Sequence, residues 1–211
     1  MAKRKKRGNP SPKIEIVDTT KPIVLISGIP GAGKSFFGRW LVANKSFLHF
    51  EFEQDKLPIS LEKHGLTQVW ERFSNDTNSH EFIDGLRNLN QPVALDYGFP
   101  VNDLCLSMVQ RFCKAGITPW WFTGDRLQAR IHMLVDKPNN GPNFDKQYAS
   151  ITEGWPKISQ LFGSNIIQTV PPDGTHVSPV EIYTRIFPAQ KKRRSITGRR
   201  QGAVTTPRKK K

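Results

Sequence analysis

The sequence has few cysteines and no long apolar run. Two of its 211 residues are cysteine, Cys105 and Cys113, and they stand eight positions apart on a predicted helix. This number and spacing favour small core residues in a reducing compartment over a disulfide framework. No apolar stretch approaches the roughly 20 residues of a membrane span, and no secretory signal opens the chain. We therefore expect no membrane segment and a cytoplasmic location, or a nuclear one in a eukaryotic host.

Two other features are missing. The five histidines are scattered without a metal-ligand spacing, so all of them are interpreted as structural. The central part of the chain also lacks excess charge. Residues 1–20 hold six of the 32 Lys and Arg and two of the 18 Asp and Glu, while residues 188–211 hold ten basic residues and no acidic one. Residues 21–187 are left with 16 of each. The length suits one α/β domain, which we place at residues 21–187.

The two basic tails, residues 1–20 and 188–211, are rich in Gly, Pro, Ser and Thr and poor in large apolar side chains. Such segments bury too little surface to offset the entropy of ordering, so we expect both to be disordered. Their clustered charge favours salt-sensitive contact with nucleic acid or another polyanion. The alternative is that they are solubilising ends, and the first could act as a nuclear import signal.

One glycine-rich stretch carries the strongest signal in the chain. Residues 28–35 read GIPGAGKS, directly after the apolar run of residues 23–26. They match G-x-x-x-x-G-K-[ST], the loop that cradles nucleotide phosphates between a buried strand and a helix N-terminus. Lys34 would reach the β- and γ-phosphates and the Ser35 hydroxyl would ligate Mg²⁺. The predicted nucleotide-binding residues are Gly28, Ile29, Pro30, Gly31, Ala32, Gly33, Lys34, Ser35 and Phe36.

The pattern around this loop alternates strands with helices. Predicted strands cover residues 23–27, 46–53, 91–96, 118–122 and 165–169. Predicted helices lie between them, with one at residues 143–162 interrupted near residues 154–156 and a last one at residues 178–187. Residues 137–142 form a turn-rich loop suited to part of a lid. This order predicts a five-stranded parallel sheet with helices on both faces.

Charged side chains follow three of these strands. Ligands of open α/β sheets bind at the carboxyl ends of the strands, so these residues should share one rim. Asp55 follows the second strand, and Asp96 ends the third, where it could hold Mg²⁺ or cap the next turn. Arg126 and Arg130 are four apart on a helix and could neutralise a transferring phosphoryl group, or could simply be a solvated helix face.

Residues 21–187 resemble the small P-loop kinases, and within them the predicted-kinase branch that includes polynucleotide 5′-kinases, zeta-type toxin kinases and antibiotic phosphotransferases. Besides residues 28–35, the likeness rests on residues 96–98 and 125–130, and on a closing strand, Asp-Gly-Thr loop and Ser-Pro-Val-Glu helix start similar to the family's adenine-side loop and last helix. The resemblance implies a P-loop NTPase three-layer α/β/α sandwich with a small helical lid. It also implies ATP and Mg²⁺ as ligands, Asp55 as the base that acts on the acceptor hydroxyl, and Arg126 with Arg130 around the γ-phosphate.

One departure affects the acceptor side. The family often has an arginine shortly after the acceptor carboxylate, whereas Lys56, Leu57 and Pro58 follow Asp55 here, and Glu53 competes for the same role. The sequence thus favours a kinase whose catalytic residues are Lys34, Asp55, Arg126 and Arg130, with Ser35 and Asp96 at the metal. The hydroxyl acceptor is not identified, although the tails favour a polynucleotide end. The alternatives are an ATPase or ATP-dependent switch acting on nucleic acid, and a nucleic-acid-binding protein that keeps a nucleotide pocket.

Overall fold

A single parallel sheet organises the computed structural model, which describes residues 21–52, 59–76, 80–98 and 101–188. The sheet has five strands in the order β2-β3-β1-β4-β5, and every neighbouring pair is parallel. Their bounds are Ile23–Gly28 for β1, Leu48–Phe52 for β2, Val93–Tyr97 for β3, Pro119–Gly124 for β4 and Ile166–Val170 for β5. The predicted five-stranded parallel sheet is therefore confirmed, with β1 at its centre.

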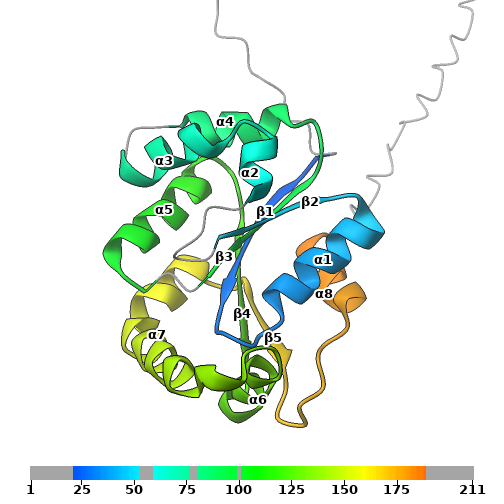
Figure 1. The fold of residues 1–211 in the computed structure, drawn as a ribbon, viewed down its shortest axis with the longest axis vertical. Helices are drawn as coiled ribbons and strands as arrows, with labels where there is room; N and C mark the ends of the chain where they lie inside the picture. The colour runs from blue at the N-terminus through cyan, green and yellow to red at the C-terminus, as the bar shows by residue number, and fades with distance from the viewer. Residues whose placement is uncertain (1–20, 53–58, 77–79, 99–100, 189–211) are drawn as a thin grey trace, which may run out of the picture.

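Helices cover both faces of this sheet (Figure 1). They are α1 (Lys34–Lys45), α2 (Ile59–Lys63), α3 (Thr67–Asn75), α4 (Glu81–Asn88), α5 (Asp103–Lys114), α6 (Arg126–Asp136), the 3₁₀ turn η1 (Pro138–Asn140), α7 (Gly141–Phe162) and α8 (Pro179–Ile186). In Figure 1, α1 and α8 lie together on one side of the sheet, and α5 and α7 lie on the other. The result is the predicted three-layer α/β/α arrangement.

Side chains of β4 show how the two outer layers are held. Successive residues of a strand point to opposite faces. Phe122 packs toward α1, with its ring 5.7 Å from that of Phe37. The preceding residue, Trp121, is fully buried on the other face, 5.3 Å from the ring of Phe162 in α7. Tandem large aromatics therefore fill both faces of a buried strand, as expected for a parallel sheet covered on both sides.

Aromatic rings also join the helices at the β2 side of the fold to the sheet. The ring of Phe52 in β2 lies 4.2 Å from that of Trp70 in α3, which in turn lies 5.0 Å from that of Phe82 in α4. Phe73 of α3 contacts Phe112 of α5 at 5.0 Å. Aromatic pairs at these separations contribute about 0.5–1.5 kcal/mol each beyond their buried area. They fix α3, α4 and α5 over one face of β2 and β3.

Residues 138–162 form more regular structure than the sequence predicted. The expected interruption of the helix near residues 154–156 is wrong, because α7 continues through Pro156. Proline removes one helical hydrogen bond, and here the carbonyl that loses its partner belongs to Thr152 on the exposed side of α7. Ile151, Ile158 and Phe162 are buried on the opposite side and hold the helix in place. Residues 137–142, predicted as a loop, form η1 and the start of α7.

The domain bounds at residues 21 and 187 remain a prediction. The described residues run from 21 to 188, and both tails lie outside them, so their disorder remains a prediction. None of the helices in the described ranges combines the length and the apolar character needed to cross a membrane.

Candidate nucleotide-binding site

The phosphate-loop sequence forms a sharp connection between β1 and α1. Gly28 ends β1, and α1 begins at Lys34 after Gly33, which has a φ of 79° and no side-chain cap. Within the described residues, several backbone N–H groups of this turn donate no hydrogen bond to the protein: those of Gly31, Gly33, Ser35 and Phe36. Clustered N–H groups at the positive end of a helix bind anions. The turn thus has the chemistry of a phosphate cradle.

Hydrogen bonds and packing with neighbouring elements fix the position of the loop. The Ile29 amide donates to the Phe122 carbonyl of β4 at 3.1 Å, and the Gly28 amide to the Gly98 carbonyl at 2.9 Å. Helix α6 packs directly on the loop at Gly31, whose φ is 75°. A Cβ at Gly31 would overlap the carbonyl oxygen of Ala129 in α6. Only glycine therefore fits between the loop and α6.

The charged residue of the motif lies over the same turn. The Lys34 ammonium donates to the carbonyl oxygens of Gly28 at 3.3 Å and Ile29 at 3.2 Å. A lysine has three donors on a flexible stem, so the ammonium can exchange carbonyl partners for phosphate oxygens without leaving the loop.

The predicted metal residues are brought together. The Ser35 hydroxyl donates to Asp96 Oδ2 at 2.9 Å. Asp96 is 3 % exposed, and it reaches the rim because β3 runs parallel to β1 with Asp96 opposite Ile26. Burial raises the pKa of the Asp96 carboxyl, and the Lys34 charge and the Ser35 hydrogen bond oppose that rise. A hydroxyl and a carboxylate oxygen beside a phosphate cradle are the hard ligands that Mg²⁺ prefers, so the residues present fit this ion.

Two residues beside Asp96 were missed by sequence reasoning. Glu51 of β2 is opposite Asp96 of β3 in the register, so both carboxylates lie on the face that α1 covers. His49 is on the same face, and its buried Nε2 has no hydrogen-bond partner among the described residues. Burial lowers the pKa of His49, against the effect of the Asp96 and Glu51 charges. Glu51 reaches this position through the β2–β3 register, which could not be read from the sequence.

The arginine pair lies as predicted on one face of α6, and its partner is an acid of α7. Arg126 Nη2 is 3.0 Å from Asp145 Oδ1, and Arg130 Nε is 3.4 Å from Asp145 Oδ2. The Arg126 guanidinium also lies 5.1 Å from the centre of the Tyr148 ring. The hydrogen bond from Arg126, followed by the charges of both arginines, lowers the pKa of the Asp145 carboxyl.

Two histidines that were interpreted as structural lie beside the cradle. The ring of His132 in α6 is 4.2 Å from that of His176, which follows β5. His132 Nε2 is 2.9 Å from the Gly174 carbonyl oxygen, and because a carbonyl only accepts, this nitrogen carries a proton. The ring of His176 is 6.0 Å from that of Phe36, and it borders Gly33. Burial, and then the charge of His132, lowers the pKa of His176.

Asp55, the predicted acceptor base, and its competitor Glu53 lie outside the described residues. Their roles remain predictions. Among the described residues, no group of three or more His, Cys, Asp or Glu side chains is arranged to hold a metal ion.

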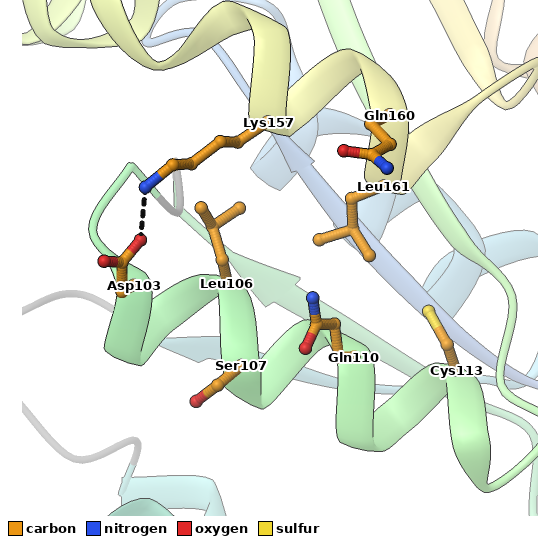
Figure 2. Close-up of a pocket in the computed structure, with 8 residues that line it drawn as sticks. All are labelled: Asp103, Leu106, Ser107, Gln110, Cys113, Lys157, Gln160 and Leu161. Carbon is orange, nitrogen blue, oxygen red and sulfur yellow. Dashed lines mark hydrogen bonds and ion pairs between the residues drawn. The ribbon is translucent and has the colours of Figure 1, made fainter.

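A separate groove of about 560 Å³ lies between α5 and α7 (Figure 2). It is lined by Asp103, Leu106, Ser107, Gln110, Cys113, Lys157, Gln160 and Leu161. A 2.6 Å ion pair between Lys157 and Asp103 spans one end, and none of the lining residues belongs to the phosphate cradle. Burial raises the pKa of the Cys113 thiol, which makes it a poor nucleophile at neutral pH.

Similarity to known proteins is found among solved structures. No family model and no curated protein matches the sequence. A shikimate kinase from Acinetobacter baumannii in complex with shikimate is 18 % identical, with a TM-score of 0.46 over 79 % of this chain and 91 % of that one. A gluconokinase from Sinorhizobium meliloti 1021 is 11 % identical, with a TM-score of 0.40 over 77 % and 86 %. A deoxyadenosine kinase from M. mycoides with bound dATP is 9 % identical, with a TM-score of 0.42 over 78 % and 97 %. The function has to be argued from the site itself.

Proposed function

We propose that the chain is an ATP- and Mg²⁺-dependent phosphotransferase that moves the γ-phosphoryl group to a hydroxyl. The observation that carries the proposal is the cluster of unpartnered amides at the start of α1, set beside Lys34 and the Ser35–Asp96 pair. Such a cluster is costly unless an anion occupies it or water solvates it. The lysine and the metal-type oxygens next to it suit a polyphosphate.

The chain's own groups would do the work of binding and charge neutralisation. The amides of Gly31, Gly33, Ser35 and Phe36 would hold phosphate oxygens, and Lys34 would neutralise their charge. Ser35 and Asp96 would hold Mg²⁺, directly or through water, and the ion would supply positive charge that offsets the charge of the phosphates. The rings of His176 and Phe36 lie 6.0 Å apart beside the cradle, and the base of the nucleotide would stack on one of them.

Transfer depends mainly on positioning and charge stabilisation. Arg126 and Arg130 are placed on the helix that covers the loop, and we propose that they exchange Asp145 for the transferring phosphoryl group. Asp55 is proposed as the base for the acceptor hydroxyl, on the sequence resemblance. Glu51 is the described carboxylate that lies beside Asp96, so it is a second candidate for contact with the metal or the acceptor.

The proposal is tested by incubating the purified chain with Mg²⁺ and γ-labelled ATP. The acceptors to compare are DNA and RNA with 5′-hydroxyl ends, nucleosides, sugars and aminoglycosides. Lys34→Ala should abolish transfer, because it removes the charge over the cradle. Lys114→Ala is the matched control, since Lys114 is exposed on α5 and should not matter. Labelled phosphate released with no labelled acceptor would identify an ATPase instead, and no binding of ATP at all would refute the proposal.

The base can be assigned with three amide variants: Asp55→Asn, Glu53→Gln and Glu51→Gln. The variant that loses transfer while retaining ATP affinity identifies the base. If Asp55→Asn transfers normally and Glu53→Gln does not, the assignment moves by two residues.

The basic tails favour a polynucleotide end as the acceptor. Their ten and six basic side chains would contribute salt-sensitive contacts to a phosphate backbone. Transfer to a 5′-hydroxyl oligonucleotide should then fall steeply between low and physiological salt, while transfer to a nucleoside should change little. Equal salt dependence of the two reactions would contradict a role for the tails in acceptor binding.

A further inference from the structure

An irregularity between β4 and β5 lies next to the phosphate cradle. The two strands pair in register at Trp121 and Ile166, at Phe122 and Ile167, and at Thr123 and Gln168, and then Gly124 pairs with Val170. Thr169 is therefore an extra residue on β5. A bulge of this kind re-aims a side chain, and bulges are enriched next to active sites.

The bulge directs the Thr169 side chain into the fold beneath the cradle. Thr169 is 1 % exposed. Its hydroxyl donates to the Ala32 carbonyl oxygen at 2.7 Å, with the Thr123 carbonyl oxygen further away at 3.1 Å. A hydroxyl carries one proton, and the shorter contact makes Ala32 its main acceptor.

Peptide geometry links this hydrogen bond to the phosphate side of the loop. The Ala32–Gly33 peptide is trans, like all described peptide bonds. In a trans peptide the C=O and N–H groups point in opposite directions. A hydroxyl that holds the Ala32 carbonyl toward β5 therefore turns the Gly33 N–H away from β5, and this N–H, like those of Gly31, Ser35 and Phe36, has no acceptor among the described residues.

Gly33 has little else to fix its orientation. Glycine adopts positive and negative φ values about equally readily, so its φ of 79° is not fixed by its own backbone preference. No side chain caps the helix at this position. The Gly33 carbonyl accepts from the Phe37 amide at 2.9 Å, which fixes the following peptide but not the preceding one. The Thr169 hydroxyl acts on the preceding peptide.

We propose that Thr169 is a positioning residue: its hydroxyl orients the Ala32–Gly33 peptide so that the Gly33 amide points at the bound phosphate. The inference rests on the proposed function only in that the anion is the polyphosphate of a nucleotide. The hydrogen bond from Thr169 to Ala32 orients one donor of the cradle before the ligand binds. The free energy of binding is then not reduced by the cost of reorienting that peptide.

The test compares Thr169→Val, which keeps the shape and removes the hydroxyl, with Thr169→Ser, which keeps the hydroxyl. Calorimetry measures the Kd for Mg²⁺-ATP and for inorganic tripolyphosphate. Thr169→Val is expected to raise both Kd values about ten-fold, the effect of one charge-assisted hydrogen bond. Thr169→Ser should bind within about two-fold of the natural chain. Thr184→Val is the matched control, because that hydroxyl donates to a backbone carbonyl on exposed α8.

A second readout separates positioning from a general loss of stability and does not need a ligand. In glycine-selective ¹⁵N spectra of the nucleotide-free chain, the Gly33 amide resonance should shift in Thr169→Val and return in Thr169→Ser. If Thr169→Val does not fold, Thr169→Ser and Thr169→Ala form the decisive pair, since they differ only in the hydroxyl. Equal Kd values and an unmoved Gly33 resonance would overturn the inference. If the natural chain binds neither ATP nor tripolyphosphate, the proposed function fails, and the Gly33 resonance alone decides the inference.

Discussion

Gly31→Ala tests the contact between the phosphate loop and α6. Gly31 has a φ of 75°, in the left-handed region, and an added Cβ would overlap the Ala129 carbonyl oxygen of α6. Two costs are therefore expected. The backbone conformation costs an alanine about 1–2 kcal/mol. The overlap forces α6 away from the loop, and overpacking of this kind costs about 1–3 kcal/mol. The free energy of unfolding should fall by about 2–5 kcal/mol in total.

Gly116→Ala separates the two costs. Gly116 has a φ of 81°, close to that of Gly31, but a Cβ there would meet nothing within 4 Å. This variant should show only the conformational cost of about 1–2 kcal/mol. Urea unfolding at neutral pH gives both free energies, and the difference between the variants measures the clash.

The clash should also change function, because α6 carries Arg126, Arg130 and His132. A displaced α6 moves all three side chains relative to the cradle, so Gly31→Ala should weaken ATP binding under conditions where it is still folded. Gly116→Ala should bind ATP normally. Equal losses of stability in the two variants, or normal ATP binding by Gly31→Ala, would show that α6 does not close on the loop as described.

Three other outcomes are expected. Lys34→Ala should weaken Mg²⁺-ATP binding about ten-fold or more in calorimetry, since it removes charge-assisted contacts to phosphate, while Lys114→Ala should not. Asp96→Asn should abolish Mg²⁺-dependent transfer yet raise the thermal midpoint of the nucleotide-free chain, because burial raises the pKa of Asp96 and its charged form is unfavourable in the fold; a lowered midpoint would contradict this. The pKa of His176 is lowered in the folded chain, so the unfolded chain binds more protons and stability should decline as pH falls through about 6.5. His176→Gln should flatten that decline in urea unfolding between pH 7.5 and about pH 5, and an unchanged slope would refute the reasoning.

Much of the fold could be predicted because its signals are local. The run from Val24 to Ile26 holds apolar residues alone, because β1 is buried on both faces, and such a run predicts a strand of this kind. Caps were also readable: Ser178 accepts from the Glu181 amide at 3.2 Å at the start of α8, as the Ser-Pro-Val-Glu sequence indicated. The error at Pro156 has a tertiary cause, because the buried side of α7 outweighs one lost hydrogen bond.

The candidate site was predictable where one strand delivers a residue to the rim. Asp96 and Ser35 were both assigned to the metal for this reason; a hydrogen bond joins their side chains, and their role at a metal remains a prediction. Residues whose position depends on strand register or on a bulge were not found. Glu51 needs the β2–β3 register, and Thr169 needs the extra residue on β5 that turns it toward Ala32. Neither feature leaves a periodic trace in the sequence.

The arginine pair connects the charge balance of the chain to its proposed ligand. Residues 21–187 hold equal numbers of basic and acidic side chains, so this part of the chain has no net charge. The structure shows one way in which the charges balance: Asp145 uses both carboxylate oxygens to hold Arg126 and Arg130. Exposed ion pairs of this kind contribute only about 0–1 kcal/mol each. A phosphoryl group carries more charge and more acceptor oxygens than one carboxylate, so it can take both guanidinium groups from Asp145. A neutral domain can therefore still present two cations to a phosphate, because the acid that balances them is a weak competitor at the same position.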